Sequence, residues 1–338
     1  MSRDAVKTLF HPFATGTIEL PSEGASVLFL GAEAGFDLPK GFAGKLHAVQ
    51  GFRPAFRQLE ALGLDPSAFA EGDSHDLALV LMTRHRGDNE AMVAEAVSRL
   101  KPGSTIVVAG AKEDGVQSFR KRLAAMGMEI EHLAKYHAQA FWFVRPHDTK
   151  SIVDGFTPKP VIVENRFRTA PGMFSHQEVD NGSAFLARYL PKGAKGQAAD
   201  FAAGWGYLSV MLAEVSPEIE EIDLYEADHA SLEAARANMK ANCPKMQTRF
   251  FWHDLVHEDV RGRYDLIIMN PPFHEGHASE PSIGQAMIRA ASKALKNGGQ
   301  LLMVANRGLP YEPVLAGAFK NSGETARNAR YKVLWGKK

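Results

Sequence analysis

Residues Tyr264–Phe273 read Tyr-Asp-Leu-Ile-Ile-Met-Asn-Pro-Pro-Phe, an apolar strand that stops at an Asn-Pro-Pro-Phe corner. Two consecutive prolines remove two backbone donors and fix two φ angles, so the strand cannot continue and the chain leaves the sheet in an extended form. Asn270 is therefore held at the carboxyl end of a strand, where ligands bind in open α/β sheets. Its amide can accept a hydrogen bond from an amine, and the Phe273 ring offers a face on which a flat heterocycle can stack. The stretch predicts a site for chemistry on an exocyclic amino group.

Length and composition indicate a two-domain globular protein. The chain has 338 residues, of which 45% are hydrophobic, and a soluble chain of this length usually forms two domains. Its one cysteine, Cys243, excludes an internal disulfide and suits a reducing compartment. The N-terminus lacks the apolar core of a signal peptide, and no apolar run is long enough to span a bilayer. We therefore expect a cytoplasmic protein without a membrane contact.

Charge is balanced over the whole chain but unevenly distributed. Residues 281–338 contain ten Lys or Arg and two acidic residues, whereas residues 151–280 contain twelve basic and nineteen acidic residues. A basic end can meet a polyanion such as RNA. A solvated surface explains the same pattern equally well, so charge alone leaves this choice open.

The two halves of the chain repeat one pattern of strand, helix, glycine turn and strand. This order predicts parallel sheets with helical crossovers, and its recurrence at a spacing of roughly 190 residues indicates a duplication. Independent convergence of two such units explains the similarity less well. We place the division near residues 145–150, which gives domains 1–148 and 149–338.

Only the second half is expected to keep a working site. Where the second half has Asn-Pro-Pro-Phe, the first has Met82-Thr83-Arg84-His85. The early glycine turn of the first half also carries Glu33, whose charge would repel an anionic group of a ligand.

A second motif of the later half is a strand ending near Ala202, a turn at residues 203–206 and a helix from Tyr207. Gly204 and Gly206 let the backbone approach a ligand closely, and the amides at a helix start can bind an anionic group. Glu226 ends the next strand and can accept hydrogen bonds from ribose hydroxyls. Asp254 closes a third strand-like segment and can accept from an adenine amine.

Each of these features has an ordinary structural explanation: a tight connection for the glycine turn, a solvated acid for Glu226 and a turn cap for Asp254. Their order at successive strand ends, followed by Asn-Pro-Pro-Phe, predicts a nucleotide-like cofactor site. A nicotinamide dehydrogenase shares the Gly-x-Gly turn. It leaves the Pro-Pro corner unexplained and lacks a proton donor for a carbonyl, so we reject it.

These motifs resemble those of class I S-adenosylmethionine-dependent methyltransferases, and the Asn-Pro-Pro-aromatic corner is typical of members that act on planar nitrogens. More closely, the chain is similar to bacterial ribosomal RNA guanine-N2 methyltransferases. The similarity is strong from about residue 156 to residue 311 and extends only to the layout before Pro146. The matching motifs are Asp200-x-Ala202-x-Gly204-x-Gly206, Glu226, Asp254, Pro171–Ser175, Asp180–Ser183, Asn270–Gly276 and Asn306–Tyr311.

The resemblance implies an α/β fold with two tandem Rossmann-like methyltransferase domains and mostly parallel, seven-stranded-type sheets, the N-terminal one degenerate. It implies S-adenosylmethionine as cofactor, S-adenosylhomocysteine as product, no metal, and ribosomal RNA or a ribosomal subunit as partner, with 16S rRNA favoured. The implied site has two sets of residues. The catalytic set is Asn270, Pro271, Pro272 and Phe273, and the cofactor set is Asp200, Ala202, Gly204, Gly206, Glu226, Asp254, Phe174 and Ser175.

In the implied reaction the Asn270 side chain and the Pro271 carbonyl accept the two N–H bonds of the guanine amine, and Phe273 stacks on the base. Pro272 holds the turn. Two residues depart from the family pattern. Ala202 replaces a usual glycine, which is a modest change if φ there is negative, and we expect cofactor binding to survive it. The bulky Trp205 is expected to be held against the N-terminal half.

Other functions share parts of this pattern. The same corner serves enzymes that methylate adenine N6 or a protein glutamine, and an RNA-binding scaffold without activity fits the first half. A small-molecule methyltransferase leaves the first half and the basic end unexplained. Nothing in the sequence predicts an oligomer, so a monomer is favoured.

Overall fold

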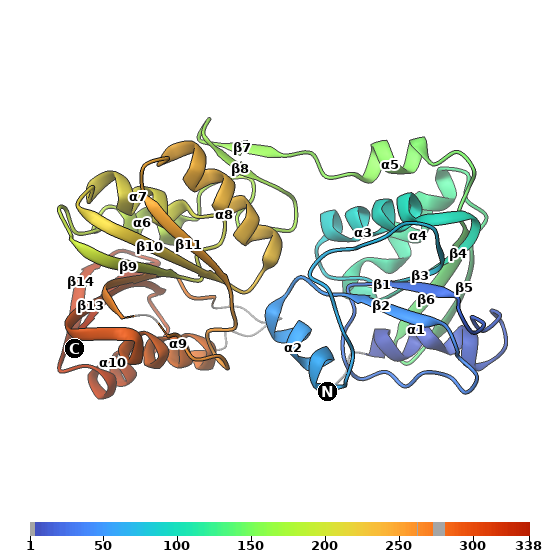
Figure 1. The fold of residues 1–338 in the computed structure, drawn as a ribbon, viewed down its shortest axis with the longest axis horizontal. Helices are drawn as coiled ribbons and strands as arrows, with labels where there is room; N and C mark the ends of the chain where they lie inside the picture. The colour runs from blue at the N-terminus through green and yellow to red at the C-terminus, as the bar shows by residue number, and fades with distance from the viewer. Residues whose placement is uncertain (1–3, 262, 273–280) are drawn as a thin grey trace. The chain divides into compact units, whose positions relative to one another are not determined.

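The computed structural model describes residues 4–261, 263–272 and 281–338 (Figure 1). Contacts divide the chain into two units, Met1–Lys159 and Pro160–Lys338. The sequence placed the division after residue 148. Helix α5 (Lys150–Phe156), which follows that point, packs Ile152 and Phe156 into the apolar core of the first unit.

The second unit is built on a seven-stranded sheet in the order β11-β10-β9-β12-β13-β15-β14. The five strands from β11 to β13 run parallel, whereas β15 and β14 are antiparallel to their neighbours. The apolar, β-branched segments that the sequence marks as strands supply the buried centre of the sheet. The strands are β9 (Gly196–Phe201), β10 (Ile219–Glu226), β11 (Gln247–Trp252), β12 (Tyr264–Met269), β13 (Leu295–Asn306), β14 (Asn321–Arg327) and β15 (Tyr331–Lys337).

Helices cover both faces of this sheet, as Figure 1 shows. The core on one face is filled from α6, α7 and α8, and the core on the other face from α9 and α10. A short hairpin, β7 (Val161–Val163) and β8 (Phe167–Thr169), precedes them. The helices are α6 (Asn181–Ala187), α7 (Tyr207–Val215), α8 (His229–Asn242), α9 (Pro281–Ala294) and α10 (Glu312–Ala318).

The first unit has a six-stranded sheet in the order β2-β1-β3-β4-β6-β5, again with helices on both faces. Its strands are β1 (Ser26–Leu30), β2 (Lys45–Val49), β3 (His75–Leu81), β4 (Leu100–Ala111), β5 (Glu131–Lys135) and β6 (Ala138–Val144). Its remaining helices are α1 (Asp4–Ala14), α2 (Arg53–Ala61), α3 (Arg86–Arg99), the 3-10 turn η1 (Lys112–Asp114) and α4 (Val116–Ala125).

The two sheets have one strand order, except that the first lacks a counterpart of β11 within the described residues. A single parallel bridge between Val49 and Ser67 occupies that position beside β2. The expected fold class, two tandem Rossmann-like methyltransferase domains with the first reduced, is confirmed by these sheets.

A repeated polar contact supports the duplication. In the first unit Asp76 accepts from the backbone N of Ser26 at 2.9 Å and pairs with Lys101 at 2.5 Å. In the second unit Asp265 accepts from a backbone N at 2.9 Å and pairs with Lys296 at 2.7 Å. In each unit this contact ties the strand that carries the aspartate, β3 or β12, to the start of its parallel neighbour, β1 or β9. The corresponding sequence positions therefore have the same structural role.

Candidate active site

Three parallel strands of the second unit, β9, β10 and β12, end side by side. Their register places the last residues of the strands opposite one another. Ala202, Glu226 and Asn270 therefore lie at one edge of the sheet, with the end of β9 in the middle. The sequence predicted this grouping from the order of the motifs, because the carboxyl ends of parallel strands meet at one edge.

The turn after β9 adopts left-handed backbone at three positions. The φ angle is +59° at Ala202, +54° at Gly204 and +87° at Gly206. The negative φ that would make alanine a modest change at position 202 is not found, so this alanine occupies a conformation that favours glycine. A Cβ at Gly206 would lie 3.2 Å from Cα of Ala235 in α8, whereas a Cβ at Gly204 would meet no atom within 4 Å. Gly206 therefore permits close helix packing, and Gly204 leaves room for a ligand against the backbone.

Trp205 fixes this turn from inside the second unit. Its ring is 4% exposed and lies 5.2 Å from that of Phe167 between centroids, so the expected contact with the N-terminal half is wrong. Its Nε1 donates to the carbonyl of Phe174 at 2.9 Å, and its own carbonyl accepts from Nδ2 of the buried Asn238 at 2.9 Å. The large ring is tolerated in the turn because it points into the apolar core.

Through Trp205, the segment of Phe174 and Ser175 is tied to the glycine turn. The Phe174 side chain is 57% exposed, and Ser175 has a φ of +49°. This position beside the turn is compatible with the expected contact of both residues with the cofactor, which stays a prediction.

Glu226 lies across the turn from β10. Its Oε2 accepts from the backbone N of Gly204 at 2.7 Å, and its Oε1 accepts from the backbone N of Ala227 and of Asp228 at 2.8 and 2.9 Å. Burial raises the pKa of Glu226 to about 7, although these hydrogen bonds oppose the shift. The carboxylate is thus fixed beside the open side of Gly204, as an acceptor of ribose hydroxyls requires.

Asp200 is completely buried one residue before the end of β9. The hydroxyl of Ser209 in α7 donates to its Oδ2 at 2.7 Å, whereas its Oδ1 is buried without a hydrogen-bond partner among the described residues. Burial raises the pKa of Asp200 to about 7, and the nearby charge of Glu226 contributes to the rise. In this structure the carboxylate joins the turn to α7 and presents no surface to a ligand.

Asp254 lies two residues beyond β11 and is 3% exposed. Its Oδ1 accepts from the backbone N of Val256 at 3.0 Å, and its Oδ2 lies 2.8 Å from Nδ1 of His257. It caps its own turn, the structural explanation that the sequence also allowed. The expected contact with an adenine amine stays a prediction.

Asn270 is held by two residues from the start of α6. Its Nδ2 donates to Oδ2 of Asp180 at 2.9 Å and to Oγ of Ser183 at 2.8 Å. Asp180 is also the N-cap of α6, where the same oxygen accepts from the backbone N of Ser183 at 2.8 Å. Pro271 is buried and Pro272 is exposed, while Phe273 lies outside the described residues.

These contacts determine which end of the Asn270 amide is available. An ionised carboxylate can only accept, so Nδ2 must face Asp180. Both Nδ2 protons are then used, and Oδ1 accepts no hydrogen bond within the described residues. The site therefore offers an oriented carbonyl acceptor at the strand end, suited to an N–H donor. The sequence matched Asp180 and Ser183 to a family motif without giving them a role. Asp-x-x-Ser predicts a helix cap, but no signal along the chain predicts a contact across 90 residues.

No group of three or more His, Cys, Asp or Glu side chains among the described residues is arranged to hold a metal ion. No described helix is both long enough and apolar enough to cross a membrane.

Comparison with known proteins also indicates a methyltransferase. The family described as "Methyltransferase small domain" matches residues 164–335. Ribosomal RNA small subunit methyltransferase C of Escherichia coli O9:H4 is 32% identical over 273 residues, which cover 76% of this chain and 74% of the relative. The protein of the same description from Erwinia tasmaniensis is 30% identical, covering 80% and 78%.

A solved structure agrees over nearly the whole chain. It is described as the T. thermophilus 16S rRNA N2 G1207 methyltransferase in complex with AdoMet and guanosine. Its TM-score is 0.77 at 25% identity, covering 99% of this chain and 93% of that one. The strand order, the glycine turn and the Asn-Pro-Pro corner define a class I S-adenosylmethionine-dependent methyltransferase. Within that class, the chain belongs to the ribosomal RNA small subunit methyltransferase C family.

Proposed function

We propose that this protein transfers a methyl group from S-adenosylmethionine to the exocyclic N2 amine of a guanine in 16S rRNA. The observation that carries the proposal is the Asn270 amide, whose nitrogen is bound by Asp180 and Ser183 and whose oxygen is left as an acceptor. Family membership and the likeness to a methyltransferase described with AdoMet and guanosine support the choice of guanine.

The reaction requires the protein to present a poor nucleophile, because the lone pair of the guanine amine is delocalised into the ring. Asn270 Oδ1 and the Pro271 carbonyl accept the two N–H bonds, which directs the lone pair out of the base plane. The same two oxygens stabilise the positive charge that develops on the nitrogen. The bound cofactor supplies an electrophilic methyl group. The stacking expected of Phe273 stays a prediction.

The proposed cofactor site follows the glycine turn. Gly204 leaves the backbone accessible, and the fixed carboxylate of Glu226 accepts from ribose hydroxyls. Gly206 and Asp200 act by holding the turn against α8 and α7. The other residues proposed at or near the cofactor are Ala202, Asp254, Phe174 and Ser175.

The first unit is proposed to serve ribosomal RNA recognition or structure rather than catalysis. Its glycine turn is followed by Gln50 at the end of β2, where the second unit has Glu226, and the Gln50 amide donates to the carbonyl of Ala32 at 2.8 Å. The position thus lacks the carboxylate expected of a ribose site. With a ribosomal substrate, we propose that the protein acts in the cytoplasm.

The test uses labelled cofactor with 16S rRNA or the small subunit, followed by digestion to nucleosides. Label in N2-methylguanosine supports the proposal, and label in N6-methyladenosine or in a protein glutamine contradicts it. Asn270→Ala should abolish transfer and leave cofactor affinity unchanged by calorimetry. Near-normal turnover in this variant would remove Asn270 from the mechanism.

A further inference from the structure

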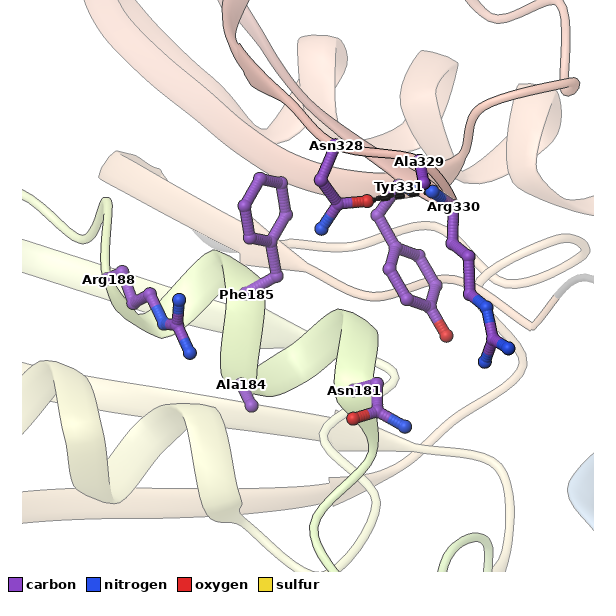
Figure 2. A pocket seen from close by; sticks show the side chains of 8 residues that line it. All are labelled: Asn181, Ala184, Phe185, Arg188, Asn328, Ala329, Arg330 and Tyr331. Atoms are coloured by element: carbon purple, nitrogen blue, oxygen red, sulfur yellow. Dashed lines mark hydrogen bonds between the residues drawn. The ribbon is translucent and has the colours of Figure 1, made fainter.

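A pocket of about 360 Å³ lies in the second unit, and one of its lining residues, Asn181, directly follows the Asp180 that binds Asn270. Its walls come from α6 and the following turn, with Phe185 and Arg188, and from the β14–β15 hairpin, with Asn328, Arg330 and Tyr331. Figure 2 shows the two arginines at opposite ends of the pocket with the two rings between them. The volume is near the lower end of the range for ligand pockets, so it suits a group of about the size of one nucleotide.

The pocket carries positive charge that no described residue neutralises. Arg188 and Arg330 are exposed, and neither side chain forms an ion pair within the described part of the chain. Two neighbouring basic side chains do form ion pairs: Arg327 pairs with Glu324 at 2.5 Å, and Lys332 pairs with Glu312 at 2.6 Å. The two arginines at this pocket therefore leave their charge available to an anion.

Tyr331 connects the pocket to the catalytic corner. A Cβ at Gly182 would lie 3.0 Å from Oδ2 of Asp180 and 3.2 Å from the Tyr331 ring. Gly182 thus lets the Tyr331 ring pack on the start of α6, close to the Asp180 carboxylate that binds Asn270. Burial raises the pKa of Tyr331, and the Asp180 charge contributes, so its hydroxyl stays a hydrogen-bond donor at neutral pH.

The hairpin tip is held in shape around the pocket. The Asn328 side-chain oxygen accepts from the backbone N of Arg330 at 2.8 Å and of Tyr331 at 2.7 Å, bonds that Figure 2 draws as dashed lines. This turn fixes where the Arg330 side chain starts and which way the Tyr331 ring faces. The backbone of this pocket wall is thus preorganised, and the side chains of Arg188 and Arg330 are exposed beside it.

We propose that this pocket binds the RNA nucleotide adjacent to the target guanine, with Arg188 and Arg330 on its flanking phosphates and the Tyr331 ring against its sugar or base. The assignment rests on the proposed function. A base that is turned out of its stack into a pocket leaves its neighbours displaced, and holding the adjacent backbone keeps the base in place. Two arginines match phosphate oxygens with paired donors, and a ring accepts any base, so the contact positions the strand without reading its sequence.

The experiment measures binding separately from catalysis. A fluorescein-labelled RNA hairpin with a guanine in its loop is titrated with protein between about 50 and 200 mM KCl, following anisotropy. The variants are R188A/R330A, R188K/R330K and the charge-matched control R289A/K293A. The control residues lie on α9, which covers the opposite face of the sheet from α6. Cofactor affinity by calorimetry verifies that each variant is folded.

We expect R188A/R330A to weaken RNA binding about tenfold or more, and to reduce the salt slope by about 0.7 for each phosphate that the variant no longer neutralises. R188K/R330K should recover part of the affinity, and R289A/K293A should bind as the wild type does. The pocket assignment fails if R188A/R330A keeps the wild-type affinity and slope, if R289A/K293A is weakened equally, or if the wild type does not bind this RNA. Wild-type protein that binds this RNA through the two arginines but forms no methylguanosine in 16S rRNA or the small subunit contradicts the proposed function, and it leaves the pocket supported only as a site for RNA phosphates.

Discussion

Replacing Asp180 with alanine separates a structural role from a catalytic one. Asp180 caps α6 through the backbone N of Ser183 and also accepts from Nδ2 of Asn270. After the replacement Asn270 keeps only its bond to the Ser183 hydroxyl. A hydroxyl can donate or accept, so it no longer distinguishes the two ends of the amide. The Asn270 oxygen is then free to turn inward, and the acceptor for the substrate amine is lost.

The expected loss of kcat follows from the hydrogen bonds that Asn270 Nδ2 donates to Asp180 and Ser183. A hydrogen bond to a charged group contributes about 1.5–3 kcal/mol, and a neutral one about 0.5–1.5 kcal/mol. If the Asp180 bond is fully expressed in the transition state, Asp180→Ala lowers kcat by roughly 10- to 150-fold at about 1.4 kcal/mol per tenfold. Ser183→Ala keeps the cap and the carboxylate, so it should lower kcat by less, about 2- to 10-fold. The lost cap should also reduce stability by about 0.5–2 kcal/mol in Asp180→Ala.

The assay is methyl transfer to ribosomal RNA at saturating cofactor, together with a thermal melt of each variant. The matched control is Asp228→Ala, because Asp228 caps α8 through the backbone N of Ser231 at 2.8 Å and has no described contact with Asn270. Both aspartate variants should lose similar stability, but only Asp180→Ala should lose kcat. Equal kcat in the two variants would refute the orienting role and leave Asp180 as a helix cap.

Three further predictions concern the glycine turn and its acids. Glu226 acts as an ionised acceptor with a pKa of about 7, so cofactor affinity measured by calorimetry should fall as pH drops through 7. Glu226→Gln should lose about 10- to 100-fold in cofactor affinity and most of its pH dependence. The control Glu220→Gln, on the same strand, should change neither the affinity nor its pH dependence. Ala202→Gly relieves the strain of a φ of +59° and should raise the free energy of unfolding by between zero and about 1 kcal/mol. Ala203→Gly relieves no such strain, so it should lower the free energy of unfolding. Equal losses of melting temperature in the two variants would contradict this. Asp200 has a folded-state pKa of about 7 against an ordinary 3.8, so the folded state retains a proton that the unfolded state releases, and stability should fall from pH 4 to pH 7 by at most about 4 kcal/mol. Asp200→Asn should flatten that decline in melting temperature, and an unchanged slope would place the cause elsewhere.

The sequence predicts the part of the site that local chemistry determines. Two prolines must end a strand, and successive strands of a parallel sheet must end at one edge. The sequence therefore predicts that Asn270, Glu226 and the glycine turn lie at one edge of the sheet, as the strand register shows. The strand pattern likewise predicted both sheets, because buried parallel strands are continuous apolar runs.

Contacts between residues distant along the chain were not predictable in this way. The left-handed φ at Ala202 is not indicated by alanine itself, and the glycine usual at this position in the resembling family is the only sign of it in the sequence. A bulky Trp205 in a tight turn suggested an external partner, but its ring fills the core beside Phe167. The hydrogen bond between Asn270 and Asp180 spans 90 residues and forms only once α6 packs against β13 and β15 of the sheet.

The reduced first unit differs from the second at the positions that are proposed to carry the chemistry. When Asp76 is aligned with Asp265, because both make the same backbone and lysine contacts, Leu81 stands at the position of Asn270 and is completely buried. The sequence pattern places Met82 at that position, so its alignment is wrong by one residue. At the end of β2, the side-chain oxygen of Gln50 accepts from the backbone N two residues later, as Glu226 Oε1 does at the end of β10. The side-chain nitrogen of Gln50 donates to the Ala32 carbonyl, whereas Glu226 Oε2 accepts from the backbone N of Gly204. The bonds that shape the strand ends are thus kept, while the oriented acceptor and the carboxylate are both replaced. Restoring only one of the two, as in Gln50→Glu, should therefore not create a cofactor site, because the carboxylate would face the Ala32 carbonyl instead of an N–H donor.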